Sequence, residues 1–208
     1  MYATVADLRA EGVTAAQGDD ARLARLSDEA SALIDRLAGW FFAPRERTFR
    51  MSGRGTATVE PPVPPIRLDR LTVGGVELPT AEVILVGAPA EPGFDAPLLA
   101  LRGGVFPRGV ANLEASGLWG YTEPDGTPFG STPPAIRRAT MLLVRQWLAP
   151  LASTDADDAR LRARLIEERT RDQAYRLAPM STDAALVGDP DLADLLAPYC
   201  RPMGLGAV

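Results

Sequence analysis

The 208-residue sequence contains no histidine and no lysine, and it has a single cysteine, Cys200. Histidine is the commonest general base and metal ligand, so its absence excludes Ser-His-Asp and Cys-His catalytic arrangements. One cysteine cannot form an intramolecular disulfide. No apolar run reaches the length of about 18 residues that a membrane-spanning helix needs, so no membrane partner is expected.

Charge and composition restrict the classes of function that the protein can have. All 22 basic residues are arginine, and 27 acidic residues bring the net charge to −5. This negative net charge argues against a protein whose main function is to bind the phosphates of nucleic acids. The apolar fraction of 46% is enough for a substantial core.

The sequence offers no catalytic or metal-binding pattern. Cys200 has no base beside it that would activate a nucleophile. The acidic run that starts at Asp155 lacks the glycine and glutamate of a calcium loop, since Arg160 and Ile166 stand at those positions. We therefore expect no enzymatic activity, no cofactor and no metal; a glycoside hydrolase with an Asp/Glu pair is the one enzyme alternative.

The most apolar helix is predicted behind Pro133 and Pro134, because proline is tolerated in a helix first turn. Its apolar residues recur at the three- and four-residue spacing of one helix face. They are Ile136, Ala139, Leu142, Leu143 and Trp147. Everything before this helix is expected to pack onto it.

Two helices are predicted near the N-terminus. Thr4 and Asp7 have the spacing of a capping box for a short helix that ends at Gly12. Asp19 and Asp20 open a longer amphipathic helix to about Gly39. Three aromatic residues, 40–42, follow it and are interpreted as a hinge packed into the core, with a ligand cage as the alternative.

From Arg45 to Tyr121 the apolar period changes from helical spacing to alternation, which predicts β-strands. Gly74-Gly75 lies between two such runs and indicates a hairpin turn. The segment from Pro61 to Ile66 is predicted to be a stiff connector outside the sheet. The region is long enough for a small antiparallel sandwich or open barrel.

The C-terminal third is predicted to hold two more helices. The first begins in the run 153–158 and reaches about Leu177, with charges of both signs along it. The second is a short helix capped by Asp189, whose apolar residues share one face. They are Leu192, Leu195, Leu196 and Tyr199. A helix this short needs a surface to dock on.

These predictions define an α+β fold: a helical core of about four helices, an inserted antiparallel β-domain and an extended C-terminal tail. The expected boundaries are as follows. Residues 1–44 and 122–177 form the two halves of the helical core, 45–121 the β-rich insertion, and 178–208 the tail.

Three stretches together resemble the head–tail connector (adaptor, or head completion) proteins of long-tailed bacteriophages and gene transfer agents. The first is YATVADLRAEG followed by DDARLARLSDEASALIDRLAGW. The second is LRGGVFPRGVANLEASGLWGY followed by TPPAIRRATMLLVRQW, and the third is GDPDLADLLAPYCRP. The order and spacing of these stretches carry the resemblance, which spans most of the chain.

The resemblance implies a structural virion protein at the head–tail interface, assembled in the host cytoplasm. It implies a homo-oligomeric ring, commonly a dodecamer, between the portal protein and a neck, tail-completion or stopper protein. Packaged DNA would pass through the ring without sequence-specific binding. The tail would dock on the portal through Leu192, Leu195, Leu196, Tyr199 and Arg201; the alternative is that these residues pack on their own subunit.

Two other functions remain open at this stage. One is a neck or tail-completion protein one level further from the portal. The other is a β-rich module that binds host carbohydrate or protein, which requires exposed aromatic residues on the β-region.

Overall fold

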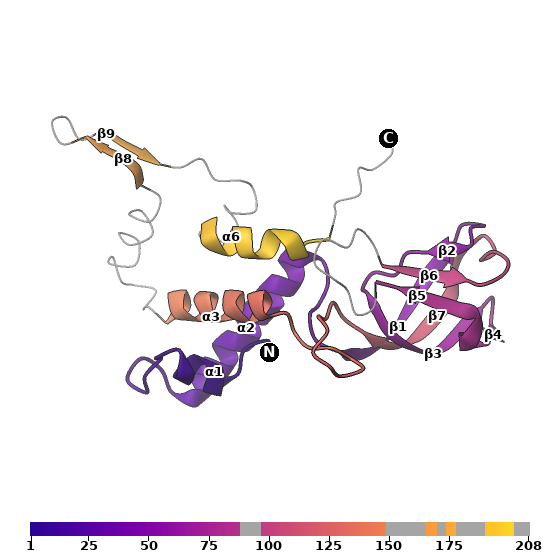
Figure 1. Ribbon diagram of the computed structural model, residues 1–208, viewed down its shortest axis with the longest axis horizontal. Coiled ribbons are helices and arrows are strands. Elements are labelled where there is room, and N and C mark those ends of the chain that lie inside the picture. Colours follow the sequence, from indigo (N-terminus) through magenta and orange to yellow (C-terminus); the bar gives the residue numbers. More distant parts are fainter. Residues whose placement is uncertain (88–96, 149–164, 170–173, 178–189, 202–208) are drawn as a thin grey trace. The chain divides into compact units, whose positions relative to one another are not determined.

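The computed structural model describes residues 1–87, 97–148, 165–169, 174–177 and 190–201 (Figure 1). These residues form two compact units. The first, the helical unit, is drawn from Met1–Leu33 and Ala135–Ala197. The second, the β-rich unit, is drawn from Ile34–Pro134 and Pro198–Val208. The mixed α+β class and the antiparallel sheets predicted from the sequence are both confirmed.

Four α-helices are found among the described residues: α1 (Val5–Ala10), α2 (Asp20–Ala38), α3 (Pro134–Trp147) and α6 (Pro190–Leu196). The capping box at α1 is confirmed, since the Thr4 hydroxyl accepts from the Asp7 N–H and the Asp7 carboxylate accepts from the Thr4 N–H. Asp19 caps α2 by accepting from the Arg22 N–H at 2.7 Å. None of these helices is long and apolar enough to cross a bilayer.

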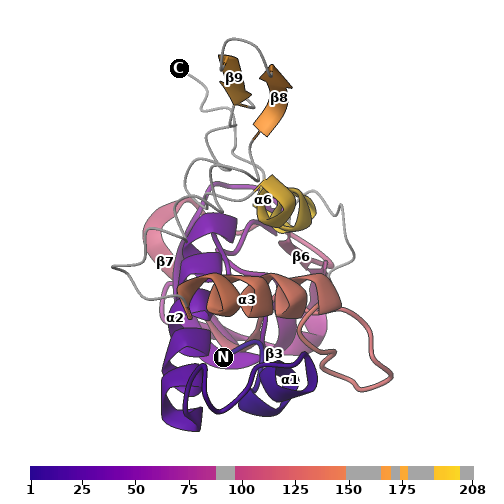
Figure 2. The ribbon, with the colours of Figure 1, turned by 90° about the vertical axis from the view of Figure 1, so that its left-hand side faces the viewer.

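The apolar faces of the first three helices form the core of the helical unit. In α3 the predicted stripe is largely buried, α2 contributes buried residues at helical spacing, and α1 contributes Leu8. Figure 2 shows these three helices beside one another. The fully or nearly fully buried residues are Leu8, Leu23, Leu26, Ala30, Ile136, Ala139, Leu143 and Val144. Leu142 and Trp147, also predicted to be buried, are half-buried.

The β-rich unit contains two antiparallel sheets. The first has the order β1-β7-β3-β4, with β1 (Arg45–Gly53), β7 (Gly109–Trp119), β3 (Pro65–Val73) and β4 (Val76–Leu78). The second has the order β2-β6-β5, with β2 (Thr58–Val59), β6 (Leu98–Leu101) and β5 (Val83–Val86). The apolar core of the β-rich unit includes Met51, Leu71, Val83, Leu99, Phe106 and Leu113.

Several local predictions for this unit can be compared with the strands. The Gly74-Gly75 hairpin is confirmed: both glycines have positive φ, as a two-residue turn between antiparallel strands requires. Trp40 and Phe42 are buried, which confirms their packing into the core, while Phe41 is half-buried. The connector prediction was too long, because Pro65 and Ile66 belong to β3. Proline is acceptable there as the first residue of a strand.

The helix predicted to end at about Leu177 is wrong over its last part. The structure forms a two-stranded antiparallel hairpin there, β8 (Leu165–Arg169) and β9 (Ala174–Leu177). The earlier part of that prediction, 153–164, lies outside the described residues. The segment has few apolar residues at helical spacing, and charge pairs along a helix contribute only about 0.2–0.5 kcal/mol each, too little to impose a helix.

Candidate interaction surfaces

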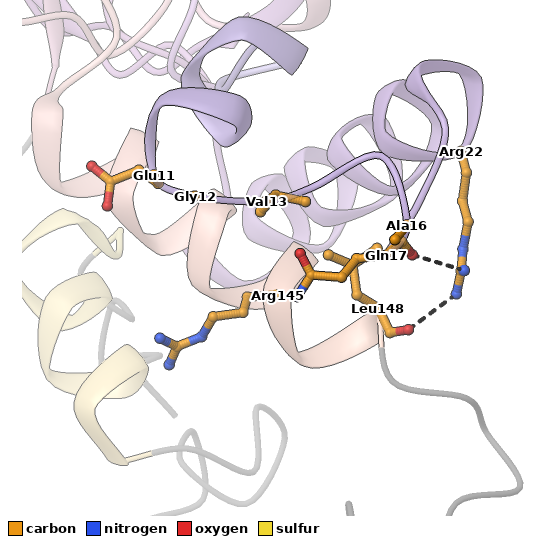
Figure 3. Close-up of a pocket in the computed structure, with 8 residues that line it drawn as sticks. All are labelled: Glu11, Gly12, Val13, Ala16, Gln17, Arg22, Arg145 and Leu148. Carbon is orange, nitrogen blue, oxygen red and sulfur yellow. Dashed lines mark hydrogen bonds between the residues drawn. The ribbon is translucent and has the colours of Figure 1, made fainter.

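A cavity of about 590 Å³ opens on the helical unit between the α1–α2 loop and the end of α3 (Figure 3). Val13, Ala16 and Leu148 give it apolar walls, and Arg22 and Arg145 add positive charge. Glu11 also lines the cavity, and its carboxylate is paired with Arg138.

The two arginines of the cavity differ in how they are held. The Arg22 guanidinium donates to the main-chain carbonyls of Gln17 (3.3 Å) and Leu148 (3.2 Å) (Figure 3). Arg145 is exposed and forms no hydrogen bond or ion pair with the described part of the chain. Arg145 is therefore the guanidinium that can accept a new anionic partner without giving up an existing one.

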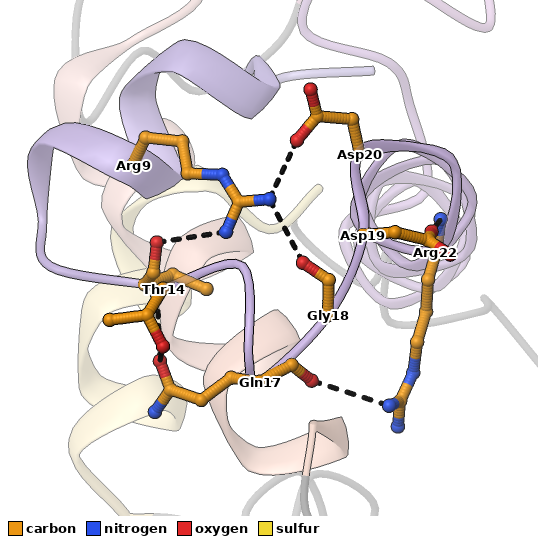
Figure 4. A network of polar contacts seen from close by, with 8 residues as sticks. Arg9, Thr14, Gln17, Gly18, Asp19, Asp20 and Arg22 are labelled. Carbon is orange, nitrogen blue, oxygen red and sulfur yellow. Dashed lines mark hydrogen bonds and ion pairs between the residues drawn. The ribbon is translucent and has the colours of Figure 1, made fainter.

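The loop that forms one wall of the cavity is fixed by Arg9 (Figure 4). Its guanidinium donates to the carbonyls of Val13 (3.0 Å) and Gly18 (2.9 Å) and forms an ion pair with Asp20 (2.6 Å). The Gln17 side chain in turn accepts from the Thr14 N–H at 2.8 Å. One arginine therefore joins α1, the loop and the start of α2.

The residues predicted to dock on a portal are held by their own chain. Leu192 and Leu196 are buried, and Leu195, on the same helix, is half-buried. Tyr199 is buried and Arg201 is half-buried at the edge of the β-rich unit. Docking of these residues on a portal stays a prediction, and it would require Leu192, Leu196 and Tyr199 to become exposed.

Tyr199 makes three kinds of contact within the β-rich unit. Its hydroxyl donates to the Glu123 carboxylate at 2.8 Å, and its carbonyl accepts from the indole N–H of Trp40 at 2.8 Å. Its ring packs edge-on against Phe42 and Tyr121. Burial, together with the bond to Glu123, raises the pKa of the Tyr199 hydroxyl above its ordinary value.

Arg201 closes the same segment onto the unit. Its main-chain N–H donates to the Ala38 carbonyl at 2.8 Å. Its guanidinium forms an ion pair with Glu60 and a weak hydrogen bond to the Pro62 carbonyl at 3.4 Å. Tyr199 and Arg201 thus fasten residues 199–201 at two separate points.

The carbohydrate-binding alternative gains no support from these surfaces. No group of three or more acidic, histidine or cysteine side chains that could hold a metal occurs among the described residues. Phe129, 38% exposed, is the one aromatic residue of the described β-rich unit that is more than a third exposed. A carbohydrate platform would need several such rings.

Sequence reasoning missed the cavity and the Trp40–Tyr199 link. Arg22 and Arg145 are far apart in the sequence, and nothing in their spacing indicates a shared cavity. A usable signal did exist for Trp40, because a buried indole needs an acceptor for its N–H. That requirement predicts a partner without identifying it.

No family model matches the chain, and no curated protein matches it by sequence. Solved structures do match its fold. A chain from the neck of an empty gene transfer agent particle, computed with C6 symmetry, is 19% identical with a TM-score of 0.59; the match covers 99% of this chain and 93% of that one. A chain from the neck of a native particle, computed with C12 symmetry, is 16% identical with a TM-score of 0.54, covering 98% and 91%.

A third match is a chain from the virion of a native gene transfer agent particle, with 16% identity and a TM-score of 0.50. It covers 91% of this chain and 82% of that one. The resemblance drawn from the sequence is thus confirmed at the level of the fold. The match includes both the helical and the β-rich parts of the chain, because nearly its whole length is covered.

Proposed function

We propose that this protein is a structural component of a phage-like particle, a head–tail connector that forms a ring in the neck. The observation that carries the proposal is the fold shared with gene transfer agent neck chains over 99% of this sequence. Two of those necks were computed with C6 and C12 symmetry, which supports a cyclic homo-oligomer, for which we propose twelve subunits. The absence of histidine from the sequence fits a structural role rather than a catalytic one.

In this proposal one side of the ring binds the portal and the other binds a neck, tail-completion or stopper protein. DNA passes through the channel without sequence-specific binding, consistent with the net charge of −5. A channel wall rich in unpaired basic groups would instead bind the backbone and slow its passage. The ring would assemble in the host cytoplasm and remain in the virion.

We further propose that the segment from Leu192 to Arg201 contacts the portal. Since Leu192, Leu196 and Tyr199 are buried in the isolated chain, docking through them requires the segment to leave its own subunit. The seven residues of α6 make a helix that is too short to be stable alone, so such a transfer exchanges one docking surface for another. Leu195, already half-buried, is the apolar side chain of α6 that a partner reaches most easily.

The test is to mix the purified protein with its cognate portal and determine the mass of the product by light scattering. The full chain is expected to form a complex of defined stoichiometry. A chain ending at Gly188 is expected to fail, and Leu195→Glu to weaken binding at least tenfold. Asp194→Asn is the matched control on the same helix, since Asp194 is exposed, and it is expected to bind normally.

The possible outcomes separate the parts of the proposal. If the full chain does not bind the portal, the connector role is contradicted. If the chain ending at Gly188 binds as well as the full chain, the contact lies outside the tail. A chain that ignores the portal but binds the tail-completion protein alone is a neck protein of the next level, the second candidate that the match to neck structures supports.

A further inference from the structure

One end of the β-rich unit carries a surface that we call the basic tip, formed by residues 52–57 and 102–112. These two stretches contain three arginines and no acidic residue. Arg54, Arg102 and Arg108 are exposed, and none forms an ion pair with any described residue. Most other arginines of this unit, such as Arg50 and Arg70, have a carboxylate partner. The tip is therefore a local positive surface on an acidic protein.

The basic tip is held in one shape by its backbone. The Gly55 N–H donates to the Phe106 carbonyl at 2.9 Å, and the Phe106 N–H donates to the Thr56 carbonyl at 2.8 Å. The Phe106 ring is fully buried beneath the loops. The Arg108 guanidinium donates to the Arg54 carbonyl at 3.2 Å. A surface ordered in advance loses little conformational entropy when it binds.

The tip also exposes apolar side chains. Val110 is 93% exposed and Val105 is 56% exposed. Val110 belongs to a bulge at the start of β7, where the pairing with β1 moves from Met51–Leu113 to Gly53–Gly109. In the same bulge Ala111 has a φ of 50°, an uncommon conformation for a residue with a side chain. The bulge holds Val110 away from the sheet, as expected of a contact residue.

The opposite end of β7 leads into a loop of the opposite charge, which we call the acidic loop, residues 122–131. It contains Glu123 and Asp125 and no arginine. Asp125 is exposed, and hydrogen bonds from Thr127 lower its pKa, so it stays ionised. Phe129 is exposed on the same loop. The β7 strand between the two ends has 11 residues, roughly 35 Å at the rise of an antiparallel strand.

The acidic loop is ordered as firmly as the tip. Glu123 and Ser131 exchange two main-chain hydrogen bonds of 3.0 Å, and the Thr122 hydroxyl donates to the Phe129 carbonyl at 2.9 Å. Arg67 lies 5.5 Å above the Phe129 ring, but its charge is matched by its ion pair with Asp69. The loop therefore presents a carboxylate and an aromatic ring at fixed positions.

We propose that the basic tip of one chain binds the acidic loop of a second copy of the same chain, head to tail. This inference rests on the ring of the proposed function. A cyclic ring requires a heterologous contact, in which each subunit uses two different surfaces. The tip and the loop meet that requirement, because they lie at opposite ends of β7 and each chain can bind two neighbours at once. The arginines pair with Asp125, and Val105 and Val110 are covered together with Phe129.

Nucleic acid is the competing occupant of the basic tip. Phosphates would pair with the three arginines but would leave Val105 and Val110 in water. A second chain satisfies the charges and buries the apolar side chains in one contact, so the combination favours protein. Binding to DNA is kept as an outcome of the test.

The experiment uses charge reversal in the full chain. One variant carries Arg54→Glu and Arg108→Glu, and a second carries Asp125→Arg. Self-association is measured by sedimentation velocity over a concentration series in low salt. Each variant alone is expected to associate at least tenfold more weakly than the wild type, because like charges then face each other. An equimolar mixture is expected to restore association, since every contact in an alternating ring pairs opposite charges.

A single chain that carries all three changes is also expected to associate like the wild type. The control is Arg25→Glu with Arg137→Glu, which removes two exposed arginines of the helical unit. It changes the net charge by the same amount as the Arg54→Glu, Arg108→Glu variant. It is expected to retain association. Recovery in the mixture also shows that the variants are folded.

Three results overturn the proposal. They are a wild-type chain that stays monomeric through the series, variants that associate normally, and a mixture that fails to recover. DNA binding is measured on the same proteins. If the Arg54→Glu, Arg108→Glu variant loses DNA binding but self-associates normally, the tip is a nucleic-acid surface instead. Portal binding is measured separately, so a chain that self-associates through the tip but ignores the portal contradicts the proposed function and not this contact.

Discussion

The indole N–H of Trp40 donates a hydrogen bond of 2.8 Å to the main-chain carbonyl of Tyr199, 159 residues further along the chain. Trp40 lies two residues beyond the end of α2, and Tyr199 ends the turn behind α6. Around this bond the rings of Trp40, Phe42, Tyr121 and Tyr199 form one cluster, with centroid separations of 5.3 Å to 6.1 Å. Tyr199 is thus part of the core of the β-rich unit.

Replacing Trp40 by phenylalanine is expected to lower the free energy of unfolding by about 1–3 kcal/mol. The reason is that the buried Tyr199 carbonyl loses its donor while most of the ring packing is kept. Urea denaturation measures the change. Trp147→Phe is the control, since Trp147 is half-buried and its indole has no hydrogen bond among the described residues. Equal losses for the two variants would contradict the role of the Trp40 bond.

The Tyr199 hydroxyl is expected to make stability sensitive to alkaline pH. Because burial and the bond to Glu123 raise its pKa above the ordinary 10.0, the folded protein keeps a proton that the unfolded chain loses. The stabilisation is complete below pH 10 and decreases as the pH rises above it. Denaturation between pH 8 and 11 should show this fall, and Tyr199→Phe should reduce it. Persistence of the full fall in the phenylalanine variant would assign it to other groups.

Removing the N-terminal cap of α1 with Thr4→Ala is expected to cost about 1 kcal/mol. Bonds from the Thr4 main chain and side chain lower the pKa of Asp7. The stability from Asp7 is therefore present above the ordinary carboxyl pKa and is lost as the pH falls through its lowered value. Thr4→Ala should reduce this acid dependence, as measured by denaturation from pH 7 to 3. Thr4→Ser, which keeps the hydroxyl, is the matched control.

A methyl group at Gly117 is expected to be tolerated poorly. It would collide with the Arg67 carbonyl, which lies between the two places where the β3–β7 register shifts. Gly117→Ala should lower the free energy of unfolding by about 1–3 kcal/mol, the usual range for overpacking. Gly103→Ala is the control, since a methyl there meets nothing within 4 Å. A neutral Gly117 variant would show that the strands can separate locally without cost.

The elements that the sequence predicted well are those specified by neighbouring residues. The capping box at Thr4, the stripe of α3 and the Gly74-Gly75 turn each depend on contacts within a few positions. The pairing of β1 with β7 depends on residues far apart, and alternation along one strand does not identify its partner. Alternation therefore predicted strands but left their order open.

The C-terminal helix α6 shows a second limit of prediction from the sequence. The apolar face of α6 predicts a helix that docks on another surface, but an amphipathic pattern does not identify that surface. In this chain Leu192 and Leu196 are buried and Tyr199 bonds to Trp40 and Glu123, while docking on a portal stays a prediction. The basic tip could not be predicted, because Arg54 and Arg108 are 54 positions apart and neither indicates the other as a neighbour.

The central place of β7 also determines when the β-rich unit can form during synthesis. β1 and β3 both pair with β7 and not with each other, and Arg47 meets Trp119 across 72 residues. Both strands therefore leave the ribosome before their common partner exists, and their edges stay open until β7 emerges. Fast translation through the β7 region, or a chaperone that covers β1 and β3, would protect the nascent chain from aggregation at this stage.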